Sequence, residues 1–316
     1  MTLYGFSFAL LLGAEVFYLW LARRLNITDV PNERSSHTRA TIRGGGVIFF
    51  AALMIFSLLS GFRYPWFLAG TTLAVLISFI DDIYTLPSTV RLPVQLAGAA
   101  LLLIDAGAFA QPIAWAFALL IIVTGVINVF NFMDGINGIT GMYGLVTLGS
   151  LAFLNAELNF ADERLIALSI LALLVFGFFN FRSRAVCFAG DVGSVGLAFI
   201  ITFLVLRLIL QTGNYYFILL LAFYGVDAGL TIFQRLAKRE NILEAHRSHL
   251  YQQLVSPGPL SHLQVAGFYA LGQLFVNAIV LSSWQVGGVQ RWIGAVLIIV
   301  CLSGCHLYFK QRLARV

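Results

Sequence analysis

Eleven long apolar stretches, none with more than one charged residue, constrain this chain more than any other feature. A helix needs about 20 apolar residues to cross the hydrocarbon core of a bilayer. Hydrophobic residues make up 60% of the chain and charged residues only 10%, whereas a soluble domain carries roughly 25% charged residues. The sequence therefore predicts an all-α, polytopic membrane bundle of about 11 helices, folded as one domain over residues 1–316. The expected spans are approximately 3–22, 44–61, 65–80, 92–110, 113–130, 138–155, 164–181, 192–211, 215–232, 263–283 and 291–309.

The basic residues are distributed unevenly between the loops on the two sides of these spans. If the N-terminus lies outside, the inner loops and the C-terminal tail carry 15 of the 19 Lys and Arg residues, beginning with Arg23 and Arg24, and the outer loops carry 3. Lys and Arg accumulate on the cytoplasmic side, so we expect an external N-terminus and a cytoplasmic C-terminus. The net charge of +5 is then a topology signal, and we expect contact with lipid headgroups and not with nucleic acid.

The remaining polar residues gather in loops on a single side of the membrane. In this topology five clusters of carboxylates, amides and histidines meet on one face, and we expect them to form one cytoplasmic active site. The loops that would build it are roughly 23–43, 81–91, 131–138, 182–191 and 233–262.

Two adjacent carboxylates, Asp81 and Asp82, end the third apolar stretch in the sequence FIDDIYTL. The dipole at a C-terminal helix end disfavours anions by about 0.3–1 kcal/mol each, and adjacent carboxylates repel one another. A divalent cation or a proton-donating substrate would offset both costs. The pair is therefore a candidate catalytic site, with a solvated membrane boundary as the alternative.

Polar residues recur at every third position in NVFNFMDGING, at the end of the fifth apolar stretch. Asn128, Asn131, Asp134 and Asn137 would form one drifting polar stripe on a helix or its last turn. Amides offer both donors and acceptors, which suits a nucleobase or a sugar hydroxyl. We interpret Asp134 as catalytic and the asparagines as substrate-binding, with hydrogen bonds between helices as the alternative for the asparagines.

The stretch CFAGDVGS places a carboxylate between two glycines at the start of a helix. Gly190 lets a backbone approach closely, the helix N-terminus favours phosphate, and Ser194 follows in the first turn. Mg²⁺ usually takes one or two carboxylates and completes its octahedron with substrate phosphates and water. We interpret Asp191 as the metal ligand, with an N-cap as the alternative.

Further candidates come from two inner loops and one span. His246 and His249 would share one face of a helix; two histidines without a third ligand make a weak zinc site, whereas imidazoles beside Arg247 suit a diphosphate. Asp227 lies within a span, where a carboxylate is a functional candidate by default. Arg39 and Arg43 would hold anionic substrate groups or serve only topology. The alternative for the histidine segment is an amphipathic interfacial helix with an apolar side formed by Ile242, Leu243, Leu250 and Leu254.

Taken in order, the motifs DVPNERSSH, DD, NFMDGING, GDVGS and HRSH resemble those of the polyprenyl-phosphate N-acetylhexosamine-1-phosphate transferases. These integral membrane enzymes start cell-envelope glycans, and the resemblance covers nearly the whole chain. It implies that undecaprenyl phosphate attacks the β-phosphate of a UDP-linked N-acetylhexosamine and releases UMP, with Mg²⁺ as cofactor and Mn²⁺ as a substitute. It also implies a multi-pass protein of the bacterial inner membrane.

The resemblance assigns roles position by position. Asp191 is similar to the family's metal ligand, and Asp81 and Asp82 are similar to the acidic pair that positions or deprotonates the lipid phosphate. The other matches are Asn131 and Asp134, which organise the nucleotide and metal sites, and His246 and His249, which contact the diphosphate.

Two departures from the muramoyl-pentapeptide branch narrow the resemblance. His-Arg-Ser-His stands where that branch has adjacent histidines, and TIRGGG replaces a PTxxGG-like loop end. Both favour the branch that starts O-antigen, a part of lipopolysaccharide, or capsule chains with GlcNAc or a deoxy relative such as FucNAc. A membrane transporter of a lipid-linked sugar or ion is the alternative function. Direct attack or a phospho-aspartate, and a monomer or a homodimer, remain open at this point.

Overall fold

The computed structural model is almost entirely helical, as the apolar stretches predict, and describes residues 2–30, 40–241, 246–256 and 258–314. Within these residues, 10 helical segments are long and apolar enough to cross a membrane, and the shorter apolar helix α2 corresponds to the remaining stretch. The helices are α1 (Thr2–Arg24), α2 (Val47–Leu59), α3 (Pro65–Tyr84), α4 (Ser88–Ala106), η1 (Ala108–Ala110), α5 (Ile113–Met133), α6 (Ile139–Leu158), α7 (Glu163–Asn180), α8 (Gly190–Thr212), η2 (Tyr215–Leu221), α9 (Ala222–Ala237), α10 (Leu250–Val255), α11 (His262–Ser283) and α12 (Gly288–Leu313).

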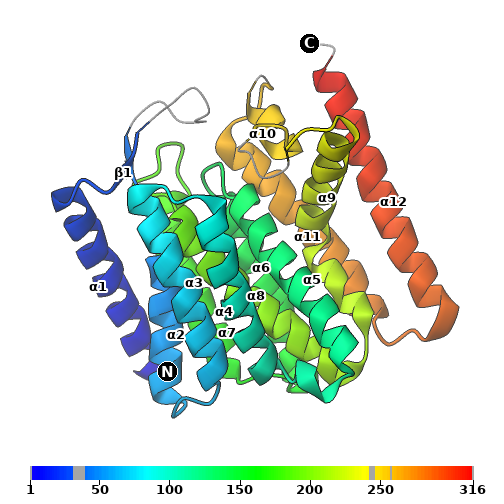
Figure 1. Ribbon diagram of the computed structural model, residues 1–316, viewed down its shortest axis with the longest axis horizontal. Helices are drawn as coiled ribbons and strands as arrows, with labels where there is room; N and C mark the ends of the chain where they lie inside the picture. Colours follow the sequence, from blue (N-terminus) through cyan, green and yellow to red (C-terminus); the bar gives the residue numbers. More distant parts are fainter. Residues whose placement is uncertain (1, 31–39, 242–245, 257, 315–316) are drawn as a thin grey trace.

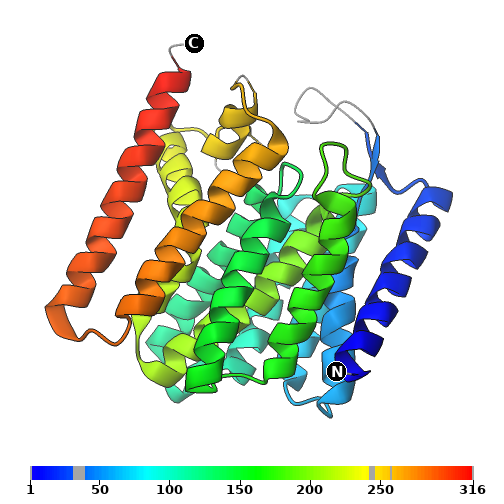
Figure 2. The ribbon, with the colours of Figure 1, turned by 180° about the vertical axis from the view of Figure 1, so that it is seen from behind.

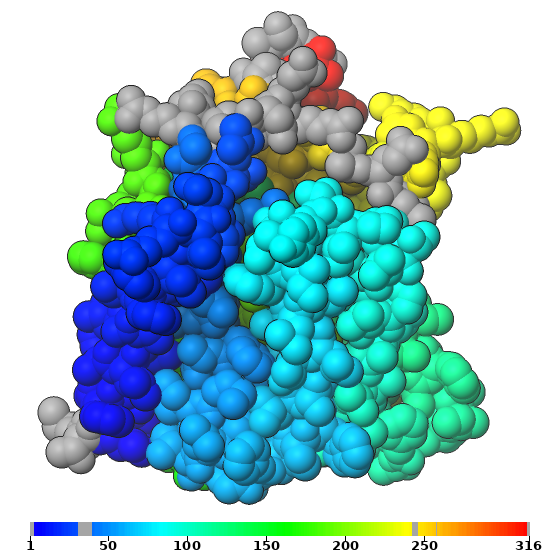
Figure 3. Space-filling model, turned by 60° about the vertical axis from the view of Figure 1, so that its left-hand side comes forward, coloured from blue at the N-terminus to red at the C-terminus, as the bar shows by residue number. Residues whose placement is uncertain are grey.

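The bundle is built around α8. In the most apolar 18-residue segment of this helix 94% of the residues are buried, whereas the corresponding share for α12 is 11%. Helices α2, α3, α4, α5 and α6 pack around α8, whereas α1 and α12 lie at opposite edges of the bundle (Figures 1 and 2). The surface of α1 lies beside that of α2 in Figure 3. A helix that is apolar on all sides can be buried at the centre of such a bundle.

The two ends of the bundle differ in what they carry. The N-terminus lies at one end, and the C-terminal end of α12 lies at the other, together with α10 and the strands (Figure 1). The strands β1 (Thr28–Asp29) and β2 (Thr41–Ile42) form a two-residue antiparallel pair, and Ile42 also forms a parallel bridge with Cys187. The end that holds this hairpin also holds the C-terminal end of α3 and the N-terminal ends of α4 and α8 (Figure 1).

Several helices extend into segments that the sequence placed in loops. Helix α3 continues to Tyr84 and α4 already begins at Ser88, so the expected loop 81–91 shrinks to the short connection 85–87. The two helices can approach closely because Gly70 and Gly98 have no side chain at their contact. A Cβ atom at either glycine would collide with the backbone carbonyl of the other. This tight antiparallel packing brings the last turn of α3 beside the first turn of α4.

Candidate active site

The acidic pair of FIDDIYTL lies in the last turn of α3. Helix α3 ends where Thr85 adopts a left-handed conformation with φ of 49°, and Asp81 and Asp82 precede this turn. The Asp81 carboxylate accepts a hydrogen bond from the backbone N–H of Leu86, which reinforces the end of the helix. Both aspartates are almost completely buried, so a simple solvated boundary does not describe them.

Asp82 caps the N-terminus of the central helix α8. Its two carboxylate oxygens accept hydrogen bonds from the backbone N–H groups of Asp191, at 2.9 Å, and Val192, at 3.0 Å. The positive end of a helix favours an anion at this position. Gly190 is required at the start because its φ of 71° and the proximity of Asp82 leave no room for a side chain. The carboxylate of Asp82 thus binds the backbone N–H groups that we expected to bind phosphate. Asp191 lies in the first turn of α8 and is not its N-cap.

The glycine-rich stretch at residues 44–46 fixes Arg43 beside this helix start. The backbone N–H groups of Gly45 and Gly46 donate to the carbonyls of Phe188 and Ala189 at 2.9 and 3.0 Å. The Arg43 carbonyl accepts a hydrogen bond of 2.7 Å from the Tyr18 hydroxyl on α1. Residues far apart in the sequence therefore hold one guanidinium group in place.

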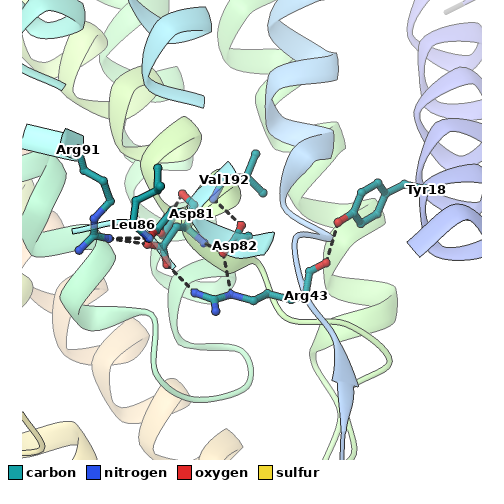
Figure 4. Close-up of polar contacts among 9 residues, drawn as sticks. Tyr18, Arg43, Asp81, Asp82, Leu86, Arg91 and Val192 are labelled. Carbon is teal, nitrogen blue, oxygen red and sulfur yellow. Dashed lines mark hydrogen bonds and ion pairs between the residues drawn. The ribbon is translucent and has the colours of Figure 1, made fainter. Parts of the chain in front are cut away.

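Two arginines connect the three aspartates (Figure 4). Arg43 Nε lies 2.6 Å from Asp82 Oδ1, and Arg43 Nη2 lies 3.1 Å from Asp191 Oδ1. Arg91 Nη1 lies 2.7 Å from Asp81 Oδ2 and 3.0 Å from Asp191 Oδ2. Each oxygen of Asp191 therefore faces a different guanidinium group, and Asp191 is the central acid of the cluster.

Three carboxylates and two guanidinium groups leave this cluster with one formal negative charge in excess. Burial opposes the charge on Arg43, but Asp82 and Asp191 outweigh that effect and raise its pKa. Arg43 therefore stays charged at any physiological pH. The excess negative charge can be neutralised by one further cation or by a proton.

The donors present fit a hard divalent cation. Carboxylate and amide oxygens are the ligands that Mg²⁺ prefers, and Asp191, with 17% of its side chain exposed, is the most accessible carboxylate of the three. Each Asp191 oxygen has one arginine partner, which leaves acceptor capacity for a metal. In the residues that the structure describes, no three His, Cys, Asp or Glu side chains surround a common metal-sized point; the two arginines lie between the carboxylates instead.

The end of α5 delivers two further candidates to the same place. Asn131, in the last turn of α5, lies near the carboxylate of Asp191, and Asp134 follows the last residue of α5. Burial and the nearby negative charges of Asp191 and Asp82 raise the pKa of Asp134 to about 8. A carboxyl group with a pKa near the working pH is suited to proton exchange.

The other polar residues of these two motifs have partners inside the protein. Asn128 donates to Gln95 on α4 at 3.3 Å, which is the helix-to-helix bond considered as the alternative. Asn137 donates to the carbonyl of Arg182 at 3.0 Å and so ties two loops together. The Ser194 hydroxyl is buried and donates to the Asp191 carbonyl at 3.4 Å. Asn128, Asn137 and Ser194 therefore form hydrogen bonds that stabilise the protein around the site.

The histidine segment is not a helix, contrary to the expectation that His246 and His249 share a helical face. His249 is the residue before α10, and its ring centroid lies 4.9 Å from that of His246. Both rings lie about 6 Å from Phe132, next to Asn131 and Asp134. Burial lowers the pKa of His246 to about 4, so it is a neutral hydrogen-bonding group rather than a cation. Arg247 lies half-buried between the two histidines.

Asp227 is buried among protein groups. Its carboxylate accepts hydrogen bonds from the backbone N–H of Leu250 at 3.0 Å and from the Tyr269 hydroxyl at 2.5 Å. His249 Nδ1 and His306 Nδ1 lie 3.6 and 3.8 Å from it. The intramembrane carboxylate thus anchors the segment that follows the histidines. Arg39, and the apolar positions Ile242 and Leu243, fall outside the described residues.

Sequence reasoning missed three residues of this site. Arg91 entered only as a loop cation, although a cation in the first turn of the helix that follows an acidic helix end is a usable signal. Tyr18 lies in the first apolar stretch, and Tyr251 lies in the expected interfacial helix. Neither tyrosine carries a local sequence signal, because their partners are distant backbone carbonyls.

Replacing Gly193 by alanine tests whether the close contact between the glycine-rich stretch and α8 matters. The new Cβ would lie 2.5 Å from the backbone Cα of Gly46, so residues 43–46 must move away from the aspartates. We expect overpacking of about 1–3 kcal/mol, a lower melting temperature and reduced activity. The matched control is Gly196→Ala in the same helix, whose Cβ meets only a Val75 methyl group at 3.3 Å. Equal melting temperatures and activities for both variants would contradict this packing argument.

Comparison with known proteins finds similarity in the segment that carries the aspartate cluster. Residues 64–209 match the model of glycosyl transferase family 4, a segment that runs from the start of α3 almost to the end of α8 and contains all the aspartates of the cluster. Over 321 aligned residues the chain is 25% identical to the probable undecaprenyl-phosphate N-acetylglucosaminyl 1-phosphate transferase of Bacillus subtilis (strain 168). That alignment covers 94% of this chain and 86% of the relative. The chain is therefore similar to glycosyl transferase family 4 over the segment that carries the aspartate cluster, and to this relative over most of its length.

Proposed function

We propose that this protein transfers N-acetylglucosamine 1-phosphate from UDP-GlcNAc to undecaprenyl phosphate and releases UMP. The observation that carries the proposal is the convergence of Asp81, Asp82 and Asp191 with two arginines at one end of a membrane-spanning bundle. The relative from Bacillus subtilis bears the name of this activity. The substrates are thus a lipid phosphate and a nucleotide diphosphate, and both are anions that such a cluster can bind.

The position of the cluster at the helix ends suits a lipid substrate. A polyprenyl phosphate keeps its chain in the bilayer and its phosphate among the headgroups. The last turn of α3 and the first turn of α8 lie at that depth if the bundle spans the membrane. Phosphoryl transfer depends mainly on positioning and on charge neutralisation, so the lipid phosphate can react without leaving the membrane surface.

The side chains divide the work by charge. Arg43 and Arg91 balance two of the three aspartate charges in the absence of substrate, and we assign them to the phosphate oxygens when substrate displaces part of these ion pairs. Asp81, Asp82 and Asp134 are the candidates for holding or accepting the proton of the lipid phosphate, and the raised pKa of Asp134, about 8, suits this exchange. His246 would donate a neutral hydrogen bond to the diphosphate.

Asp191 would hold Mg²⁺ with the help of the Asn131 amide. A bound Mg²⁺ would supply charge neutralisation at the diphosphate and stabilise the leaving UMP. The arginines that now face Asp191 would then turn toward the phosphates, since a cation and a guanidinium group compete for the same carboxylate oxygens.

We place this site on the cytoplasmic face of a bacterial inner membrane. The basic residues are concentrated at the end of the bundle that holds the aspartates, whereas Arg63 and Arg164 lie together at Asp162, at the beginning of α7. UDP-sugars are cytoplasmic, which agrees with this orientation. We assign the reaction to the start of an O-antigen or capsule chain, with FucNAc as the second candidate sugar. The transporter alternative would place its polar site near the midplane, and no observation favours it.

The test is UMP release by the purified protein in detergent. With UDP-GlcNAc, undecaprenyl phosphate and Mg²⁺ we expect stoichiometric UMP and undecaprenyl-diphospho-GlcNAc, and a panel that includes UDP-FucNAc identifies the preferred donor. Absence of UMP with every UDP-sugar, from protein with a cooperative melting transition, would reject the proposed function.

Removal of the metal gives a second expected result. Excess EDTA should abolish UMP release, and Mg²⁺ should restore it, with Mn²⁺ as a partial substitute, because oxygen ligands accept both ions. The melting temperature should hardly change, since each of the three aspartates already has an arginine partner without the metal. Full activity in EDTA would exclude the metal role of Asp191.

A further inference from the structure

Tyr251 connects the histidine segment to the turn that carries Asp134. Its side chain is 1% exposed, and its hydroxyl donates a hydrogen bond of 2.9 Å to the carbonyl of Phe132. The same hydroxyl lies against Gly135, where any Cβ would overlap it. One tyrosine therefore contacts the chain close to Asp134 on both sides.

The base of Tyr251 is fixed by the buried carboxylate of Asp227. This carboxylate accepts the backbone N–H groups of Leu250 and Tyr251, at 3.0 and 3.3 Å, and so holds the first turn of α10. Asp227 is itself held by the Tyr269 hydroxyl on α11. Three helices, α9, α10 and α11, thus determine where the Tyr251 hydroxyl lies.

We propose that Tyr251 is a positioning residue that sets the location of the Asp134 carboxyl, with Asp227 as its anchor. This inference rests on the proposed function and deepens it. Helix α5 ends beside Asp134, and the last carbonyls of a helix lack partners within the helix. The Tyr251 hydroxyl satisfies the Phe132 carbonyl and thereby fixes the turn.

The consequence for catalysis is specific. A misplacement of about 1 Å can lower a rate by about 10²-fold, whereas substrate binding uses contacts spread over the whole site. Loss of the hydroxyl should therefore reduce kcat and leave KM almost unchanged. A side chain that served only to fill space would keep its function in phenylalanine.

The experiment compares Tyr251→Phe with Tyr216→Phe. Tyr216 is equally buried, and its hydroxyl bonds Ser283 at 3.1 Å, so the control removes a similar hydrogen bond elsewhere in the bundle. We expect kcat for UMP release to fall about tenfold in Tyr251→Phe, the equivalent of one lost hydrogen bond. KM for both substrates should stay within about twofold. Unchanged kcat, or an equal change in the control, would overturn the proposal.

Hydrogen–deuterium exchange supplies a readout that does not depend on activity. Amides of residues 131–138 should exchange faster in Tyr251→Phe than in the wild type, and those of α8 should not. Unchanged exchange in residues 131–138 would overturn the proposal even if no UDP-sugar were a substrate. Faster exchange in a protein without transferase activity would instead reject the proposed function and retain the positioning role.

A second variant approaches the same contact from the other side. Gly135→Ala introduces a Cβ that overlaps the Tyr251 hydroxyl, at a residue whose φ is not positive. We expect a fall in kcat larger than that of Tyr251→Phe. In the double variant the two effects should be less than multiplicative, because removing the hydroxyl relieves the closest overlap. Fully multiplicative effects would show that the two residues act independently and would overturn the proposal.

Discussion

Asp191→Asn is expected to lower kcat by at least about 10²–10³-fold, the loss typical of removing one charge-stabilising group from an active site. The side-chain shape and one oxygen remain, but the charge that faces Arg43 and Arg91 is lost. The amide is a poor Mg²⁺ ligand compared with a carboxylate, so the Mg²⁺ concentration needed for residual activity should rise. The measurement is UMP release as a function of Mg²⁺ concentration.

Asp162→Asn is the matched control for this variant. Asp162 is also a carboxylate bound by two arginines, Arg63 at 3.3 Å and Arg164 at 2.7 Å, but it caps α7 instead of joining the aspartate cluster. Asparagine is almost as good an N-cap as aspartate, so activity should stay near the wild-type value. Activity of Asp191→Asn within tenfold of the control would remove Asp191 from the metal role.

Asp82→Ala is expected to cost both stability and activity. Its carboxylate holds two backbone N–H groups at the start of α8 and a buried ion pair with Arg43. Breaking a buried pair by removing one partner costs about 3–5 kcal/mol. We therefore expect a clearly lower melting temperature in detergent together with almost complete loss of UMP release.

Asp105→Ala separates the local role of Asp82 from a general capping effect. Asp105 on α4 accepts the backbone N–H of Phe67 at 2.8 Å and so caps the start of α3. Loss of such a cap costs about 1 kcal/mol, and activity should fall by no more than a few-fold. If Asp82→Ala melted like Asp105→Ala and remained active, the central role of Asp82 in organising α8 and Arg43 would be wrong.

Asp191→Asn and Asp82→Ala both remove a partner from ion pairs that no local sequence pattern predicts. Asp82 and Arg43 are 39 positions apart in sequence, and Asp191 and Arg91 are 100 apart. The motifs identify the acids, because carboxylates at the ends of apolar stretches are costly without a partner. They do not identify the partner, because loop cations also serve topology. Arg91 was overlooked for this reason, and Asp82 was not expected to cap α8.

The spans themselves were predictable for a physical reason. In a bilayer every backbone polar group must be satisfied within the protein, so a long apolar stretch has little choice but to form a helix. All 11 stretches correspond to apolar helical segments in the structure, although α2 is short. The helix ends were less predictable: α3 continues past the end of its apolar stretch and α4 begins before its own, because packing between the two helices, rather than hydropathy, stabilises the last turn of α3 and the first turn of α4.

Composition and local motifs were sufficient to predict the class of fold, the acids of the candidate site and the family resemblance. The pairing of charges depends instead on the tertiary structure, which shows which arginine faces which aspartate and that the buried Asp227 anchors α10. The tertiary structure also decided that the histidine segment is not helical and that Tyr251 reaches the turn of Asp134. These contacts join segments far apart in sequence, and they exist only because the helices pack around α8.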